Sequence, residues 1–143
     1  MYELVSELEI KIHKLVRARL IKEHGTDKYW RAGVPIETRK KCAEIQQEDE
    51  SPVDDLFVYT TLIQLKGIIE KKWKLFEPII PSNYSNKKPE LLKDMLRLNR
   101  IRNRVMHPVK NNKWEEVDFA FVRGLSLVFE GGKESVEFSE MVK

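Results

Sequence analysis

Hydrophobic residues near the start of the chain recur every three or four positions and predict a helix over residues 3–23. The repeating apolar positions are Val5, Leu8, Ile12, Leu15 and Val16. Charged residues fill the positions between them, which is the pattern of a helix with one face in a core. Gly25 is expected to end this helix.

A short aromatic segment and a charged helix are predicted next. Residues 27–33 are too few for a full element, and we expect a turn whose aromatic side chains fill the bundle. Pro35 suits the first position of a helix over residues 35–48. Its thin apolar face comprises Ile36, Cys42 and Ala43. The acidic residues 46–55 that follow contain Ser51-Pro52 and predict a loop.

Two further apolar faces predict the central helices of the fold. The first helix ends before Pro78 and has one face formed by Tyr59, Leu62, Ile69, Trp73 and Phe76. A polar connection over residues 81–88 leads to Pro89, which is well placed to open the second helix. The buried stripe of that helix is predicted to be Leu91, Leu92, Met95, Leu98, Ile101 and Val105. It should end near His107, because Pro108 disfavours helical geometry in the residue before it.

The last predicted helix begins at a pattern that resembles a capping box, Asn112 followed by Glu115. Its predicted apolar face is Trp114, Val117, Phe121, Leu125 and Val128. Gly124 within it is unfavourable for a helix by about 1 kcal/mol and is interpreted as a close approach of two helices. The tail, residues 131–143, is too short in pattern to assign. Four principal helices without strand pairing predict an all-α, bundle-like fold.

Length and cysteine content narrow the class of protein. A chain of 143 residues is the size of one domain, which we place at residues 1–130. No apolar run is long enough for a membrane span, and the first residues do not form a signal-peptide core. The single Cys42 excludes an internal disulfide and a cysteine cluster for zinc. We therefore expect a cytoplasmic protein.

Positive charge is concentrated in one part of the chain. Residues 87–113 contain nine basic side chains and two acidic ones, a net charge of +7, which leaves −4 on the remainder of a chain whose total is +3. Such a segment is typical of a surface that binds phosphates, although a solvated helix face has the same composition.

Arg102 and His107 lie five residues apart within this basic segment, with Asn103 after the arginine. The spacing alone is weak, because Arg19 and His24 repeat it. Position distinguishes the two copies, since Arg102 falls on the predicted apolar stripe and its charge must be compensated there. Two alternatives follow: a structural ion pair with an acid such as Glu9 or Asp118, or a bidentate contact with a phosphate in a groove or subunit interface.

His107 has the side chain best suited to general acid or base catalysis near neutral pH. Nearby arginines should lower its pKa and favour the neutral form. The competing interpretation is a histidine that merely interacts favourably with a helix end.

Residues 99–108, together with the preceding core helix over residues 65–76, resemble a HEPN domain, closest to the branch found in SWT-type RNA endonucleases. The likeness covers about residues 1–130, and only residues 99–108 form a specific motif. It implies an all-α bundle of four to five helices in which two protomers bring their motif helices together. The tail is not covered.

The resemblance also implies an activity, metal-independent cleavage of RNA by attack of the ribose 2′-hydroxyl on the adjacent phosphorus. His107 would act as general acid or base, Arg102 would stabilise the charge that develops on the phosphorus, and Asn103 would orient the substrate or His107. The residues expected to bind RNA around them are Arg97, Arg100, Arg104 and Lys110. No cofactor or metal is expected, because no acidic or histidine cluster has ligand spacing.

Partners implied by the resemblance are RNA, a second copy in a homodimer, and in a toxin-like setting an inhibitory or antitoxin protein. A different class of function stays open, because many HEPN relatives have lost catalysis and serve as RNA-binding or dimerisation modules. The sequence gives no indication of a preferred RNA target.

Overall fold

The computed structural model describes residues 1–106 and 114–130 of the chain. In this part, α-helices and short 3₁₀ helices account for the regular structure and no strand is present. The elements are α1 (Tyr2–His24), α2 (Tyr29–Gly33), α3 (Ile36–Glu48), η1 (Leu56–Tyr59), α4 (Leu62–Lys71), α5 (Trp73–Phe76), η2 (Glu77–Ile79), η3 (Ser82–Tyr84), α6 (Lys88–Met106) and α7 (Glu116–Glu130). The predicted all-α bundle is confirmed.

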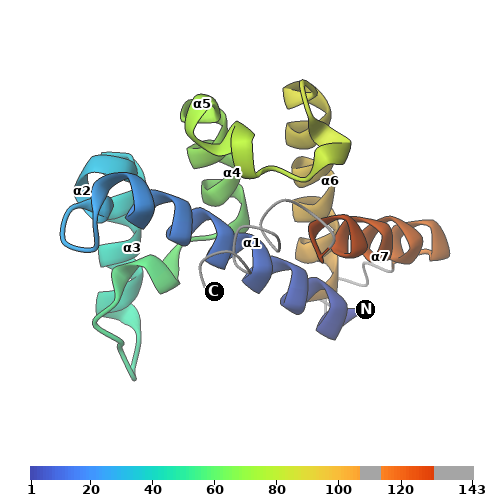
Figure 1. Ribbon diagram of the computed structural model, residues 1–143. Helices are drawn as coiled ribbons and strands as arrows, with labels where there is room; N and C mark the ends of the chain where they lie inside the picture. Colours follow the sequence, from blue (N-terminus) through green and yellow to red (C-terminus); the bar gives the residue numbers. More distant parts are fainter. Residues whose placement is uncertain (107–113, 131–143) are drawn as a thin grey trace.

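The long helix α1 connects the two ends of the molecule. Figure 1 shows α2 and α3 beside the end of α1 and α7 across its beginning, with α4 and α6 between them. All five apolar positions predicted for α1 are buried, as is Leu20 one turn later. Gly25, whose φ of 86° favours glycine, follows the helix as predicted.

Residues 27–33 differ from the predicted turn, because Tyr29–Gly33 forms the short helix α2. Tyr29 is buried and Trp30 packs partly against the core, so the aromatic side chains do fill the bundle. The reason for the tight packing is Gly33. A Cβ atom at this position would lie 2.7 Å from a methyl carbon of Leu20, so α2 approaches α1 at a distance that only glycine permits.

The charged helix α3 begins at Ile36, with Pro35 in the capping position before it. Cys42 is its buried residue, as the thin apolar face predicted, and burial raises the pKa of the Cys42 thiol. The prediction for Ile36 is wrong, since half of this side chain is exposed, at 50%. Ile36 lies in the first turn, ahead of the part of α3 that packs against η1.

The predicted central helix is divided into several pieces. Tyr59 belongs to η1, α4 begins only at Leu62, and a break at Lys72 separates α4 from α5. The start of α4 has a clear cause, because Thr61 and Gln64 form a capping box in which each side chain accepts a hydrogen bond from the other residue's backbone N–H. Leu62, Leu65, Ile68 and Ile69 are the residues of α4 in the core.

Helix α6 follows the prediction closely. It begins at Lys88, one residue before Pro89, and its described part ends at Met106. Leu91, Met95, Leu98 and Ile101 are buried, whereas Leu92 and Val105 are only partly so. Helix α6 packs against α4 and α1. The hydroxyl of Tyr84 in η3 donates a 2.6 Å hydrogen bond to Asp94 of α6, and burial together with this carboxylate raises the pKa of Tyr84.

The face that α7 buries is not the one predicted from the sequence. Its buried residues are Asp118, Val122, Leu125, Ser126 and Phe129. Trp114 precedes the helix and Val117 is 61% exposed. Apolar residues occur on most sides of this helix, so periodicity alone did not single out the buried one. Leu125 is common to both faces.

Polar partners on neighbouring helices fix the rotation of α7. Lys11 of α1 forms an ion pair of 2.8 Å with Glu130 and donates a 3.3 Å hydrogen bond to Ser126. At the start of the helix, Asp118 accepts a 2.9 Å hydrogen bond from the backbone N–H of Glu115. The predicted cap, Asn112, lies outside the described residues.

The interpretation of Gly124 as a close helix approach is also wrong. A Cβ atom at Gly124 would meet no atom within 4 Å, because this residue lies on the exposed side of α7. No helix in the described ranges 1–106 and 114–130 is long and apolar enough to cross a membrane.

Candidate functional site

The last turns of α6 carry the described part of the motif. Arg102 is half-buried, with 29% of its side chain exposed, and Asn103 after it is exposed. The position of Arg102, four residues after Leu98 and three before Val105, turns its side chain toward α1 instead of into solvent. The sequence-based expectation that its charge must be compensated is confirmed.

Glu9 of α1 supplies that compensation. The Nε of Arg102 donates a hydrogen bond of 3.2 Å to Oε2 of Glu9, whose side chain is 20% exposed. A charged pair with both members partly buried ties α6 to α1 more effectively than a fully solvated pair. Glu9 was one of the two acids that the sequence offered as a partner, and the structure selects it.

Arg102 also contacts Asn103 directly. One Nη of the guanidinium donates a hydrogen bond of 3.4 Å to the Asn103 side-chain oxygen. The guanidinium has five N–H donors, and these two bonds occupy two of them. The remaining donors are therefore free to bind an anion beside Asn103, without breaking the pair with Glu9.

The second acid named from the sequence, Asp118, pairs with a different arginine. Its carboxylate lies 3.7 Å from Nη1 of Arg104, while the same group caps the start of α7. Asp118 is buried and Arg104 is largely exposed. Arg104, predicted as an RNA-binding residue, thus also joins α6 to α7.

Arg97 has a further role that the sequence did not predict. Its guanidinium carbon lies 4.1 Å from the centre of the Phe121 ring, a stacked cation–π contact between α6 and α7. Arg100 is exposed. The predicted site residues His107 and Lys110 lie outside the described residues. The structure therefore brings together Arg102, Asn103 and Glu9, and places Arg104 and Arg97 against α7.

The second copy of the spacing has a different environment. The Nε of Arg19 donates a 2.8 Å hydrogen bond to the backbone oxygen of Leu75, which ties α1 to α5. His24 is the last residue of α1, and its Nε2 is buried without a hydrogen-bond partner. Arg19 consequently has a structural contact of its own, and the two arginines are distinguished by their partners as well as by their positions.

A histidine outside the motif also makes defined contacts. His13 of α1 lies 2.7 Å from the Thr60 hydroxyl, and its ring packs edge-on against Phe57 at 4.6 Å. Thr60 donates its only hydroxyl hydrogen to the backbone oxygen of Phe57, so the Nε2–H of His13 donates to Thr60. Burial lowers the pKa of His13, and the nearby Arg17 lowers it further. A helical pattern could not have placed Thr60 beside this ring.

Within the described residues, no group of three or more histidine, cysteine, aspartate or glutamate side chains could hold a metal ion. Comparisons with protein-family models, with curated proteins and with solved structures find no match to this chain.

Proposed function

We propose that this protein is a metal-independent RNA endonuclease of the HEPN type that acts as a homodimer. The observation that supports the proposal best is the pairing of Arg102 with Asn103 on an accessible part of α6, with guanidinium donors left over. These are two of the three residues that the motif requires. An arginine held by Glu9 is already oriented, so a phosphate would not have to order it.

The proposed reaction needs no group other than the chain and the RNA. The 2′-oxygen of a ribose loses its proton to a base, attacks the adjacent phosphorus, and displaces the 5′-oxygen of the next nucleotide, which takes up a proton. The products are a 2′,3′-cyclic phosphate and a 5′-hydroxyl. Arg102 would stabilise the extra negative charge on the phosphoryl oxygens, and His107 would transfer a proton.

Cleavage of a mixed single-stranded RNA in EDTA tests this proposal. His107→Ala should lower the single-turnover rate at least about 100-fold, since general acid or base assistance typically contributes 10²–10⁴. Arg102→Ala should lower it comparably. His24→Ala is the matched control, because it removes a histidine with the same spacing from an arginine and should leave the rate unchanged.

Substrate chemistry gives an independent criterion. An oligonucleotide with a 2′-deoxyribose at the cleaved position should resist the enzyme, because it lacks the nucleophile. Cleavage of the all-deoxy strand, complete loss of activity in EDTA, or equal rates for His107→Ala and the unaltered protein would contradict the proposal.

A second candidate, a non-catalytic module for RNA binding or dimerisation, is favoured by the ion pairs of Arg102 and Arg104. If these arginines act only as links to α1 and α7, Glu9→Gln and Arg102→Met should destabilise the fold similarly, and neither form nor the unaltered protein should cleave RNA. In the endonuclease, Glu9→Gln keeps the guanidinium and should retain measurable cleavage, whereas Arg102→Met should not. Sedimentation velocity on the same samples determines whether the dimer forms.

A further inference from the structure

A basic cavity lies at the opposite end of α1 from Arg102. It has a volume of about 430 Å³ and is bounded by α2, the first turn of α3 and the last turn of α4. Leu20, which contacts Gly33 at the edge of this cavity, is 11 residues after Glu9 on α1, a separation of about 16 Å along the helix. The cavity is thus separate from the proposed cleavage site.

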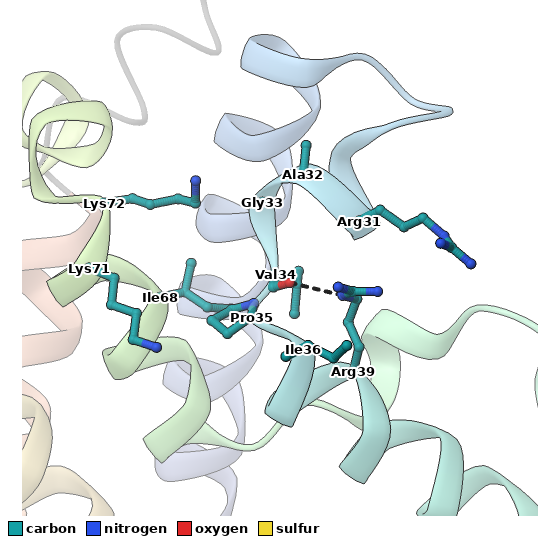
Figure 2. Close-up of a pocket in the computed structure, with 10 residues that line it drawn as sticks. All are labelled: Arg31, Ala32, Gly33, Val34, Pro35, Ile36, Arg39, Ile68, Lys71 and Lys72. Carbon is teal, nitrogen blue, oxygen red and sulfur yellow. Dashed lines mark hydrogen bonds between the residues drawn. The ribbon is translucent and has the colours of Figure 1, made fainter.

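Four cationic side chains and no acidic ones line this cavity, namely Arg31, Arg39, Lys71 and Lys72. Figure 2 shows the two lysines on one side of Pro35 and Ile68, and the two arginines on the other side. None of the four forms an ion pair in the part of the chain that the structure describes. Their mutual repulsion is uncompensated, which is the condition under which an anion is bound favourably.

The position of Arg39 is fixed by the backbone. Its Nε donates a 3.0 Å hydrogen bond to the carbonyl oxygen of Val34, which leaves the terminal nitrogens of the guanidinium available (Figure 2). An arginine held in this way loses little further freedom when it binds an oxyanion.

The beginning of α3 adds unpaired hydrogen-bond donors. Pro35 and Ile36 line the cavity, and Pro35, the residue before the helix, provides no side-chain cap. The first intrahelical bond runs from the N–H of Arg39 to the oxygen of Pro35, so the N–H groups of the preceding turn have no partner within the helix. The positive end of a 13-residue helix therefore borders the same cavity as the four cations.

The remaining surface of the cavity is apolar. Val34, Pro35, Ile36 and Ile68 lie between the two pairs of cations, and half of the Ile36 side chain is exposed. A simple inorganic anion would leave this surface unused, whereas a ligand with an uncharged ring and a phosphate would cover it. The volume is in the range of cavities that bind small organic ligands.

A neighbouring cavity of about 500 Å³ is less suited to an anion. It shares Lys71 and Lys72 with the first, but the carboxylates of Glu23 and Glu70 also line it. The purely cationic character belongs to the cavity between α2, α3 and α4 alone among these two.

We infer that the cavity between α2, α3 and α4 binds a nucleotide, with the phosphate between the arginines and lysines and the sugar or base on Val34, Pro35 and Ile68. The nucleotide could be free in solution or part of an RNA strand, because both present the same phosphorylated ribose. The inference does not depend on RNA cleavage at Arg102.

Binding of adenosine monophosphate, inorganic phosphate and a labelled single-stranded RNA oligonucleotide to the full chain tests this inference. Lys71→Gln combined with Lys72→Gln should weaken nucleotide binding about tenfold, and Arg31→Gln, on the other side, should also weaken it. For the RNA strand, the double variant should reduce the slope of log K against log salt by about 1. Methyl NMR signals of Val34, Ile36 and Ile68 should shift when the nucleotide is added.

Lys14→Gln combined with Lys41→Gln is the matched control. It removes the same charge at exposed lysines that line neither cavity, and it should bind as the unaltered protein does. Weakening only for the RNA strand would identify a strand as the ligand, and weakening only for the mononucleotide would identify a free nucleotide.

Three results would overturn the inference. They are no binding of any probe, equal weakening by the control and the test variants, and equal affinity for inorganic phosphate and the mononucleotide. Loss of RNA cleavage with nucleotide binding retained would contradict only the proposed function, so the two failures are distinguishable.

Discussion

Arg102 is held on one side of its guanidinium and open on the other. Glu9 accepts from its Nε, and Asn103 accepts from one terminal nitrogen. The same arginine can therefore stabilise the contact between α1 and α6 and bind a phosphate, since the two tasks use different N–H groups. Experiments that only delete Arg102 cannot separate these roles, which is why Glu9→Gln is included in the cleavage assay.

At the residue scale, Gly33 is the position where one added carbon should have the largest effect. Gly33→Ala places a Cβ atom 2.7 Å from a methyl carbon of Leu20, which is itself completely buried. We expect a loss of about 1 kcal/mol or more in the free energy of unfolding, because a packed core accommodates extra volume poorly. Urea denaturation measures it.

Gly67→Ala is the matched control for Gly33→Ala. Gly67 lies within α4, and a Cβ atom there would meet no atom within 4 Å. Alanine should increase the free energy of unfolding by up to about 1 kcal/mol, since it favours the helix more than glycine does. Equal effects of the two substitutions would show that α2 does not approach α1 this closely.

At the scale of the element, α7 tests whether contacts or periodicity set a buried face. Val122→Ala removes two methyl groups from a side chain with no exposure, and we expect a loss of about 2 kcal/mol in the free energy of unfolding. Val117→Ala makes the same chemical change where 61% of the side chain is exposed. It should change stability by less than about 0.5 kcal/mol.

The same denaturation measurement compares these two valine variants. The sequence pattern predicts the larger loss at Val117, and the structure predicts it at Val122. A larger loss for Val117→Ala would mean that α7 is rotated relative to the described arrangement.

Much of the element pattern was accessible from the sequence, and its failures have physical causes. The faces of α1 and α6 were predicted well, because each helix has a single apolar stripe bordered by charges. Helix α7 has apolar residues on more than one side, so its orientation depended on Lys11 and Arg104 in other helices. The division of the central helix depended on the local bonds between Thr61 and Gln64.

The candidate sites show the same distinction. Arg102 and its partner Glu9 were named from the sequence, because a charge on an apolar stripe needs an acid nearby. The cavity lined by Arg31, Arg39 and Lys71 was not predicted, since these residues are dispersed along the chain and acidic residues separate them. The adjacent pair Lys71-Lys72 was the one local signal for it.

At the scale of the whole molecule, stability should depend on pH through His13. Burial lowers the pKa of His13 below its ordinary value of 6.5, so the unfolded chain takes up a proton before the folded protein does. The neutral ring contributes its full stability above pH 6.5, and this contribution is lost as the pH falls from 6.5 through the lower pKa of the folded state. Arg17, Glu9 and Asp55 modify the shift without reversing it.

The free energy of unfolding, measured in urea between about pH 7.5 and pH 5, should therefore decrease more steeply for the unaltered protein than for His13→Gln. Glutamine keeps a donor for Thr60 but does not titrate. Carboxylates that protonate in this range are common to both proteins, so the difference between the two curves isolates His13. Parallel curves would show that the buried ring does not control this dependence.

The sequence by itself determined that the chain forms helices, where most of them begin and end, and which charge on α6 required a partner. These properties depend on residues three or four apart and on local caps, which one segment contains in full. The tertiary structure decided which side of α7 faces α1, and it gathered Arg31, Arg39, Lys71 and Lys72 around one cavity. Such choices depend on contacts between segments far apart in the chain, and the packing of the whole bundle selects among faces that are locally equivalent.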